Sequence, residues 1–119
     1  AGLGHEFLRH IERTRVLVHL IDGTTPDPVG DYNTVQQELQ AYGRGLESKL
    51  QIVALNKIDA LGPDEQTSVI AAKLSQISHA PVFLISAVAH TGLDPLLQQV
   101  WSTLDQLNLK SSVVHSSPV

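Results

Sequence analysis

The chain has 119 residues, of which 42% are apolar, and eight Lys or Arg against twelve Asp or Glu give it a formal net charge of -4. This size fits one compact domain and excludes a second large one. The acidic balance disfavours binding of nucleic acid or anionic lipid by this segment, since phosphate contacts need clustered Lys and Arg, and the absence of cysteine excludes disulfides, thiolate metal sites and a cysteine nucleophile.

The predicted elements alternate between helix and strand. In chain order they are a helix over Gly4–Arg13, a strand over Arg15–Asp22, a helix over Asp31–Tyr42, a strand over Leu50–Asn56, a helix over Asp64–Ser78, a strand over Pro81–Ser86 and a helix from Asp94. The strands are apolar almost throughout, as in parallel sheets buried on both faces. The pattern predicts an α/β fold, with a parallel sheet of about three strands and helices on both faces.

Some details of the helices can also be predicted. Asp31 is expected to be the N-cap of the second helix. The third helix is expected to bury Ile70, Leu74 and Ile77 on one stripe. On the fourth helix, Trp101 lies at helical spacing from several leucines, so we expect it to pack in the core.

The boundaries of the folded part follow from composition. Residues 1–109 are expected to form the domain, and the Ser-rich residues 110–119, which have no amphipathic period, a flexible tail. Sheets of this class carry more than three strands, so at least one neighbouring strand is expected to be missing. The strand at Val16 to Ile21 would then have an unpaired edge, which promotes self-association.

Targeting signals are not apparent. No apolar run approaches the ~20 residues that cross a bilayer, and no charged-then-apolar leader opens the chain. We therefore expect no membrane insertion and no secretion, and a cytoplasmic location suits a chain without cysteine. The chain also contains no methionine, so we expect it to be a segment of a longer protein.

Polar residues follow two of the predicted strands, at the edge where open α/β sheets bind ligands. The second strand ends in Asn56-Lys57-Ile58-Asp59, and the third in Ser86-Ala87 followed by Val88. An NKxD sequence at one strand end and SA at the next resemble the guanine-recognition elements of the translation-factor-like GTPases. The candidate nucleotide-binding residues are therefore Asn56, Lys57, Asp59, Ser86, Ala87 and Val88.

The chemistry of guanine gives this resemblance a physical basis. Guanine presents a ring N–H and an amino group on one edge, and the carboxylate of Asp59 can accept from both. The amide of Asn56 can bind both the base and nearby backbone, and Lys57 can lay its alkyl stem over the base while its ammonium stays in water. The backbone N–H of Ala87 would donate to the guanine carbonyl, with Ser86 shaping the turn.

A longer stretch narrows the family. The sequence GLGHEFLRHIERTR, residues 2–15, runs into the strand ending in Asp22 and looks like the part of the Obg family of bacterial ribosome-associated GTPases that follows their DxxG motif. The match covers about Gly2 to Leu107, essentially the whole predicted domain, and it is extended by Asp31-Tyr32, Glu38-Leu39 and Tyr42. The chain would thus be the C-terminal part of a G domain with a P-loop-NTPase-type fold.

The resemblance implies a parent protein that hydrolyses GTP, cycles between GTP and GDP, and acts in assembly of the large ribosomal subunit and in stress control. Phosphates and Mg²⁺ are held in such proteins by a P-loop and switch I, which this chain lacks. Asp27-Pro28-Val29-Gly30 spells DxxG, but it follows the wrong strand, and we interpret it as coincidental. We expect this chain to supply base recognition only and to be inactive as an enzyme by itself.

Other readings of the sequence are weaker. The alternative is a nucleotide-independent α/β interaction module, in which the strand-end residues are caps. A complete flavodoxin-like or receiver-type domain would show five strands and an acidic cluster at the first strand end, and neither is apparent in the sequence.

No G-x-S-x-G surrounds Ser86, which excludes a serine hydrolase. The six histidines include no i, i+4 pair, so no metal site is expected, and His19 is expected to be a hydrogen-bonded core or interface residue.

Overall fold

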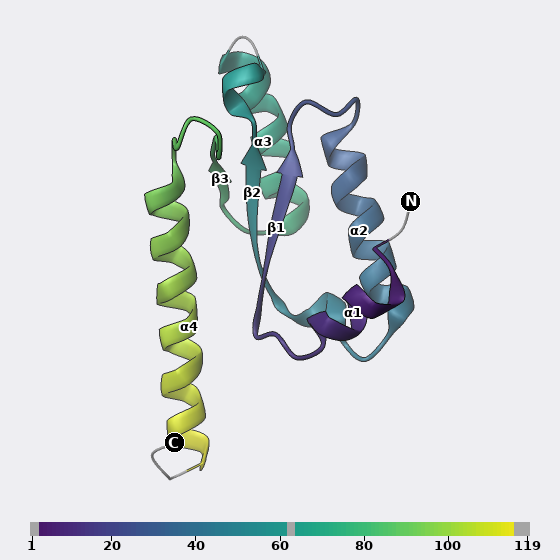
Figure 1. Ribbon diagram of the computed structural model, residues 1–119, viewed down its shortest axis with the longest axis vertical. Coiled ribbons are helices and arrows are strands. Elements are labelled where there is room, and N and C mark those ends of the chain that lie inside the picture. The colour runs from purple at the N-terminus through teal and green to yellow at the C-terminus, as the bar shows by residue number, and fades with distance from the viewer. Residues whose placement is uncertain (1–2, 62–63, 116–119) are drawn as a thin grey trace.

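The computed structural model describes residues 3–61 and 64–115, with side chains over 3–61 and 65–107. Helices and strands alternate along the chain, as the sequence predicts (Figure 1). The elements are α1 (His5–Ile11), β1 (Val16–Asp22), α2 (Pro28–Tyr42), the 3₁₀ turn η1 (Leu46–Ser48), β2 (Leu50–Asn56), the 3₁₀ turn η2 (Ile58–Ala60), α3 (Asp64–Ser78), β3 (Val82–Leu84) and α4 (Leu93–His115).

The three strands form one parallel sheet in the order β1-β2-β3. The register places Asp22 opposite Asn56, so β1 and β2 end side by side. β3 is shorter than the predicted strand, because Ser86 leaves the ladder and pairs with Thr91 in an isolated antiparallel bridge. The parallel α/β arrangement is therefore confirmed, and all three strand ends lie at the same edge of the sheet.

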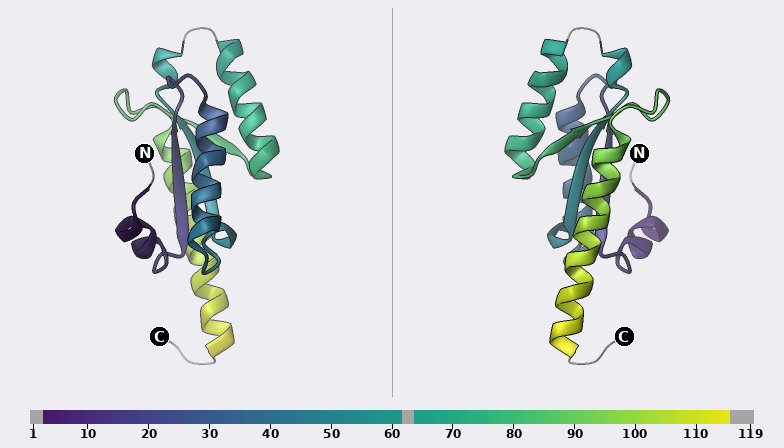
Figure 2. Two further views of the ribbon diagram at one scale, coloured as in Figure 1. Left: turned by 90° about the vertical axis from the view of Figure 1, so that its right-hand side faces the viewer. Right: turned by 90° about the vertical axis from the view of Figure 1, so that its left-hand side faces the viewer.

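Helices cover both faces of the sheet, and in Figure 1 the strands lie between α4 on the left and α2 on the right. Figure 2 shows α4 running along the strands and extending beyond them. α2 and α3 pack on one face and α4 on the other. The core on the α2–α3 side consists of Ile21, Tyr32, Val53, Leu55 and Leu74. The core on the α4 side consists of Ile52, Ala54, Ile85 and Leu96. A third cluster joins α1 to α2 and η1 through Leu8, Ile11, Leu39 and Leu46.

The start of α2 differs from the prediction, because Asp27 and not Asp31 is the N-cap. The carboxylate of Asp27 accepts from the backbone N–H of Gly30 at 3.0 Å. Pro28 at the first helical position explains the earlier start, since its fixed φ suits a helix and its missing N–H needs no partner there. The DxxG sequence is thus a helix cap, in line with its interpretation as coincidental.

The inner stripe of α3 agrees with the prediction only in part. The helix bounds match, and Leu74 is fully buried. Ile77 is wrong as a core residue, since 39% of it is exposed, whereas Thr67 is buried. The buried stripe of α3 therefore runs from Thr67 to Leu74, and the helix is exposed at Ile77 near its C-terminal end.

The last helix differs from the prediction at Trp101, which is 67% exposed rather than buried. Leu97, one turn before it, is also exposed. Leu96, by contrast, is buried against the sheet. Helical spacing correctly places these residues on apolar rows, but three strands cover only part of the apolar face of α4.

The C-terminal end of α4 also differs from the expected boundary at residue 109. The helix continues to His115, so residues 110–115 are helical where a flexible tail was expected. The sequence contains no Gly or Pro between Pro95 and Pro118, so nothing breaks the helix earlier. Residues 116–119 of the predicted tail lie outside the described residues. Within the described part of the chain, no helix is long and apolar enough to cross a membrane.

β1 is an edge strand of the sheet: among the described residues, it pairs only with β2. Leu20, on this strand, exposes more than half of its surface. An open strand edge with exposed apolar neighbours can pair with another chain. Self-association through this edge stays a prediction.

His19 packs between β1 and α2, where its ring stacks on Tyr32 with centroids 5.2 Å apart and an interplanar angle of 18°. Its buried Nδ1 has no hydrogen-bond partner among the described residues, so the expected hydrogen bond at that atom is wrong. The histidine is held by stacking and burial. Desolvation by this burial lowers the pKa of His19 below its usual value of 6.5.

The lowered pKa predicts that acid destabilises the fold. The unfolded chain binds the His19 proton more tightly, so this contribution to stability is complete above pH 6.5 and is lost as the pH falls towards the lower folded pKa. Urea unfolding at pH 7.5 and 5.5 measures the loss. His19→Phe keeps the stack and should flatten this pH dependence, whereas His10→Phe, on the exposed side of α1, should retain it. Equal pH dependence in wild type and His19→Phe would contradict the assignment.

Candidate functional site

The candidate site lies where the three parallel strands end. Asp22 and Asn56 are register partners at the ends of β1 and β2. The backbone N–H of Gly23 donates to the carbonyl of Asn56 at 3.0 Å, and the N–H of Ile58 donates to the carbonyl of Ile85 at 3.3 Å. The three loops that follow the strands are therefore fastened to one another by backbone hydrogen bonds.

The side chain of Asn56 connects the second and third strand ends. Its Oδ1 accepts from the backbone N–H of Ala87 at 3.1 Å. The structure thus brings together two predicted site residues that are 31 positions apart. It also differs from the expectation for Ala87, because the N–H expected to meet a guanine carbonyl is here donated to Asn56. The amide of Asn56 acts as the backbone-binding brace that its chemistry predicts.

The loop after β3 is shaped by Ser86, which is almost fully buried. Its backbone N–H and carbonyl both pair with Thr91 at 3.0 Å. Its Oγ accepts from the backbone N–H of Ala89 at 3.2 Å. Ser86 therefore sets the turn, as predicted. Val88, in the same loop, is 85% exposed, so its side chain packs against little of the described part of the chain.

Lys57 adopts a left-handed backbone conformation, with φ 67°. Its Nζ lies 2.8 Å from Oδ2 of Asp22. The ammonium was expected to be solvated and is instead paired, although the side chain stays half exposed. Hydrogen bonds from Lys57 and then from Thr24 lower the pKa of Asp22 to about 2. The carboxylate of Asp22 is therefore ionised across the whole physiological pH range.

Asp59 lies in η2 and is exposed. Its carboxylate accepts no hydrogen bond within the described ranges 3–61 and 64–115. The turn that carries it is tightly packed, since a Cβ on Gly23 would lie 2.8 Å from Cδ1 of Leu61. Among the described residues, Asp59 thus presents a carboxylate without a hydrogen-bond partner, on the turn that follows Asn56.

Sequence reasoning missed Asp22 as a member of this site. A signal was present, because Asp22 ends a buried strand in the same way as Asn56. Gly92 was also missed. Its φ is +73°, and an added Cβ would lie 2.1 Å from the carbonyl oxygen of Leu84. Only a glycine lets the loop close against β3 at that point.

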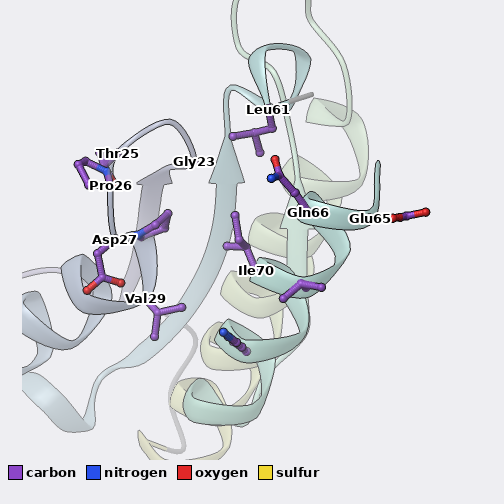
Figure 3. A pocket seen from close by; sticks show the side chains of 12 residues that line it. Gly23, Thr25, Pro26, Asp27, Val29, Leu61, Glu65, Gln66 and Ile70 are labelled. Carbon is purple, nitrogen blue, oxygen red and sulfur yellow. The ribbon is translucent and has the colours of Figure 1, made fainter. Parts of the chain in front are cut away.

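A neighbouring cavity of about 660 Å³ opens between the loop after β1 and α3 (Figure 3). Gly23 and Leu61 line one end of it, but Asn56, Lys57 and Asp59 do not. The candidate base-binding residues therefore do not line this cavity. Within the described residues, no three His, Asp or Glu side chains are grouped to hold a metal ion.

Sequence comparison finds close relatives among the GTPases named Obg, although no family model matches. GTPase Obg of Trichormus variabilis is 66% identical over 111 residues, which cover 91% of this chain and 32% of the relative. GTPase Obg of Nostoc punctiforme is 58% identical over 116 residues, 95% of this chain and 33% of the relative. The chain therefore spans about a third of the length of the curated relatives it matches.

Structure comparison finds solved structures of Era. The chain matches Aquifex aeolicus Era bound to GDP·AlF₄⁻ with a TM-score of 0.62 and 23% identity, covering 80% of this chain and 31% of Era. It matches Era in complex with MgGDPNP and nucleotides 1506–1542 of 16S ribosomal RNA with a TM-score of 0.64 and 23% identity, covering 79% of this chain and 30% of Era. At this identity the similarity shows a shared fold and no more: the chain has the fold of part of Era.

Proposed function

From its correspondence to one segment of the Obg family of GTPases, we propose that this chain supplies the base-recognition part of a guanine-nucleotide site. One observation carries the proposal: the Oδ1 of Asn56 holds the backbone of Ala87, so that the NKxD turn and the SA loop form one surface at the sheet edge. Asp59, Lys57 and Ser86 belong to the same two loops.

The free carboxylate of Asp59 fits the donor edge of guanine. Its two oxygens, which have no partner among the described residues, can accept from the ring N–H and the amino group together, which adenine does not offer as a pair. The stem of Lys57 would cover one face of the base. Ala87 would donate to the guanine carbonyl once its N–H is shared with or released from Asn56.

For the longer protein we propose GTP hydrolysis with Mg²⁺. The described residues of this chain do not fit the metal, since they contain no grouped carboxylate or imidazole ligands, and the P-loop sequence is absent. Those parts would belong to the segments of the relatives that this chain does not cover. This chain alone is proposed to be inactive in hydrolysis.

The same correspondence supports a ribosomal role for the longer protein. Era, its structural neighbour, is seen in complex with 16S ribosomal RNA. We propose the large ribosomal subunit as the partner, on the Obg resemblance, and the cytoplasm as the location. The acidic net charge of this segment supports RNA contacts elsewhere in the longer protein.

Nucleotide titrations test the base-recognition role. In the longer protein that contains this chain, we expect GDP to bind about 10- to 100-fold more tightly than IDP, which lacks the amino group that Asp59 would bind, and ADP to bind far more weakly than either. Calorimetry measures the three affinities. Amide-resolved NMR of this chain with GDP should show shifts at residues 56–59 and 87, with ADP as the control.

Two outcomes would overturn the proposal. One is equal affinity of the longer protein for GDP and ADP. The other is a nucleotide response confined to residues far from the ends of β2 and β3. Either result would favour the alternative of a nucleotide-independent interaction module, in which Asn56 and Ser86 only stabilise loops.

A further inference from the structure

The first strand end also contributes to the candidate site, through the ion pair between Asp22 and Lys57. Resting on the proposed function, we propose that Asp22 is a positioning residue that fixes the side chain of Lys57 for stacking on the guanine base. Asp22 itself would not touch the nucleotide.

The carboxylate of Asp22 is fixed before it meets the lysine. Its Oδ1 accepts from the backbone N–H of Thr24 at 2.9 Å and from the hydroxyl of Thr24 at 2.6 Å. Its Oδ2 remains for Nζ of Lys57, at 2.8 Å. Each oxygen has its own partner, so the acceptor presented to the lysine has one orientation.

The backbone on both sides of the pair is equally constrained. Asp22 and Asn56 are register partners in the parallel ladder, and Lys57 is the next residue along the chain. The N–H of Gly23 donates to the carbonyl of Asn56, which ties the two strand ends together beyond the ladder. The backbone at both ends of the ion pair is therefore held in place by hydrogen bonds.

Stability of the fold does not explain this arrangement. Both side chains are substantially exposed, and exposed ion pairs contribute little to folding. The long lysine side chain has substantial rotamer freedom, which stacking on a base would remove. If the ion pair orders the lysine side chain before the nucleotide binds, that side chain loses less conformational entropy on binding. This smaller loss raises the affinity for the nucleotide.

A double-mutant cycle in the longer protein tests this role. Asp22→Ala is expected to weaken GDP binding by roughly 5- to 30-fold, the range set by the rotamer freedom of a lysine. The loss should be the same for GDP and IDP, since stacking does not sense the amino group. In a Lys57→Ala background, Asp22→Ala should have almost no further effect.

Matched variants keep the test falsifiable. Asp22→Asn preserves an acceptor for Thr24 while removing the charge, and it should give a similar loss. Asp105→Ala removes an exposed carboxylate from α4 and should leave GDP affinity unchanged. Urea unfolding of each variant detects any loss of folding.

The outcomes separate this inference from the proposed function. The positioning role is overturned if the losses of GDP affinity in Asp22→Ala and Lys57→Ala are additive. It is also overturned if Asp22→Ala and Asp22→Asn both bind GDP with wild-type affinity. In either case the proposed function stands as long as the protein still prefers GDP to ADP. Loss of that selectivity in the wild-type protein would overturn the proposed function itself. A loss in Asp22→Ala that changes the GDP-to-IDP ratio would assign Asp22 to the amino group and also overturn the positioning role.

Discussion

Asp59→Asn should lower the affinity of the longer protein for GDP by on the order of 10²- to 10⁴-fold, because two hydrogen bonds to a charged acceptor are weakened or lost. The same change should raise the affinity for the xanthine nucleotide XDP. Xanthine has a carbonyl where guanine has its amino group, so the asparagine amide can donate where the aspartate could only repel. The exposed position of Asp59 on η2 leaves room for this exchange without repacking.

Competition binding with GDP and XDP measures the change in selectivity. Asp31→Asn is the matched control, since Asp31 lies in the first turn of α2 and accepts from Oγ1 of Thr25. It should retain the preference for guanine. If Asp59→Asn keeps normal guanine selectivity, Asp59 does not read the base.

Gly92→Ala should be the most damaging small substitution in the loop after β3. Its added Cβ would lie 2.1 Å from the carbonyl oxygen of Leu84, and the backbone at φ +73° disfavours any side chain. The bridge between Ser86 and Thr91 must open to relieve this contact. We expect the free energy of unfolding to fall by more than about 2 kcal/mol, beyond the 1–2 kcal/mol typical of a left-handed alanine, together with loss of GDP binding in the longer protein.

Gly43→Ala separates the cost of the positive φ from the cost of the close approach to Leu84. Gly43 has φ +84° but no atom within 4 Å of an added Cβ, so it carries only the conformational cost. Urea unfolding measures the free energy of unfolding of both variants, and the difference between their losses is the cost of the close approach at Gly92. Equal losses of stability would show that β3 and the loop can move apart freely, contrary to the tight packing at Gly92.

The sequence predicts the elements of this fold well, because each strand is a short apolar run and each helix has its own periodicity. It predicts less well how far each apolar face is covered. Trp101 and Ile77 lie at the correct spacing, yet they are exposed because the sheet beneath them is narrow or ends. The N-cap of α2 was misplaced because Asp27 and Asp31 are both good caps, and Pro28 decides between them.

The candidate site could be predicted where a motif marks it and not where contacts are long-range. Asn56, Lys57 and Asp59 stand together in sequence, but the bond from Ala87 to Asn56 depends on adjacent parallel strands. The partner of Lys57 is 35 positions away, and its place at the end of a buried strand is the one local signal for it. Strand-end polar residues therefore merit equal attention, whether or not a motif includes them.

The length of α4 has a mechanical consequence. Its 23 residues span about 35 Å, whereas the seven residues of β1 or β2 span about 23 Å, so the helix overhangs the sheet. It begins directly after Gly92, at the end of the loop that holds Ser86 and Ala87. Because Leu96 packs on the sheet near the start of α4, the far end is the part of the helix that a change at this loop would displace most: a tilt of about 10° would move it by about 6 Å.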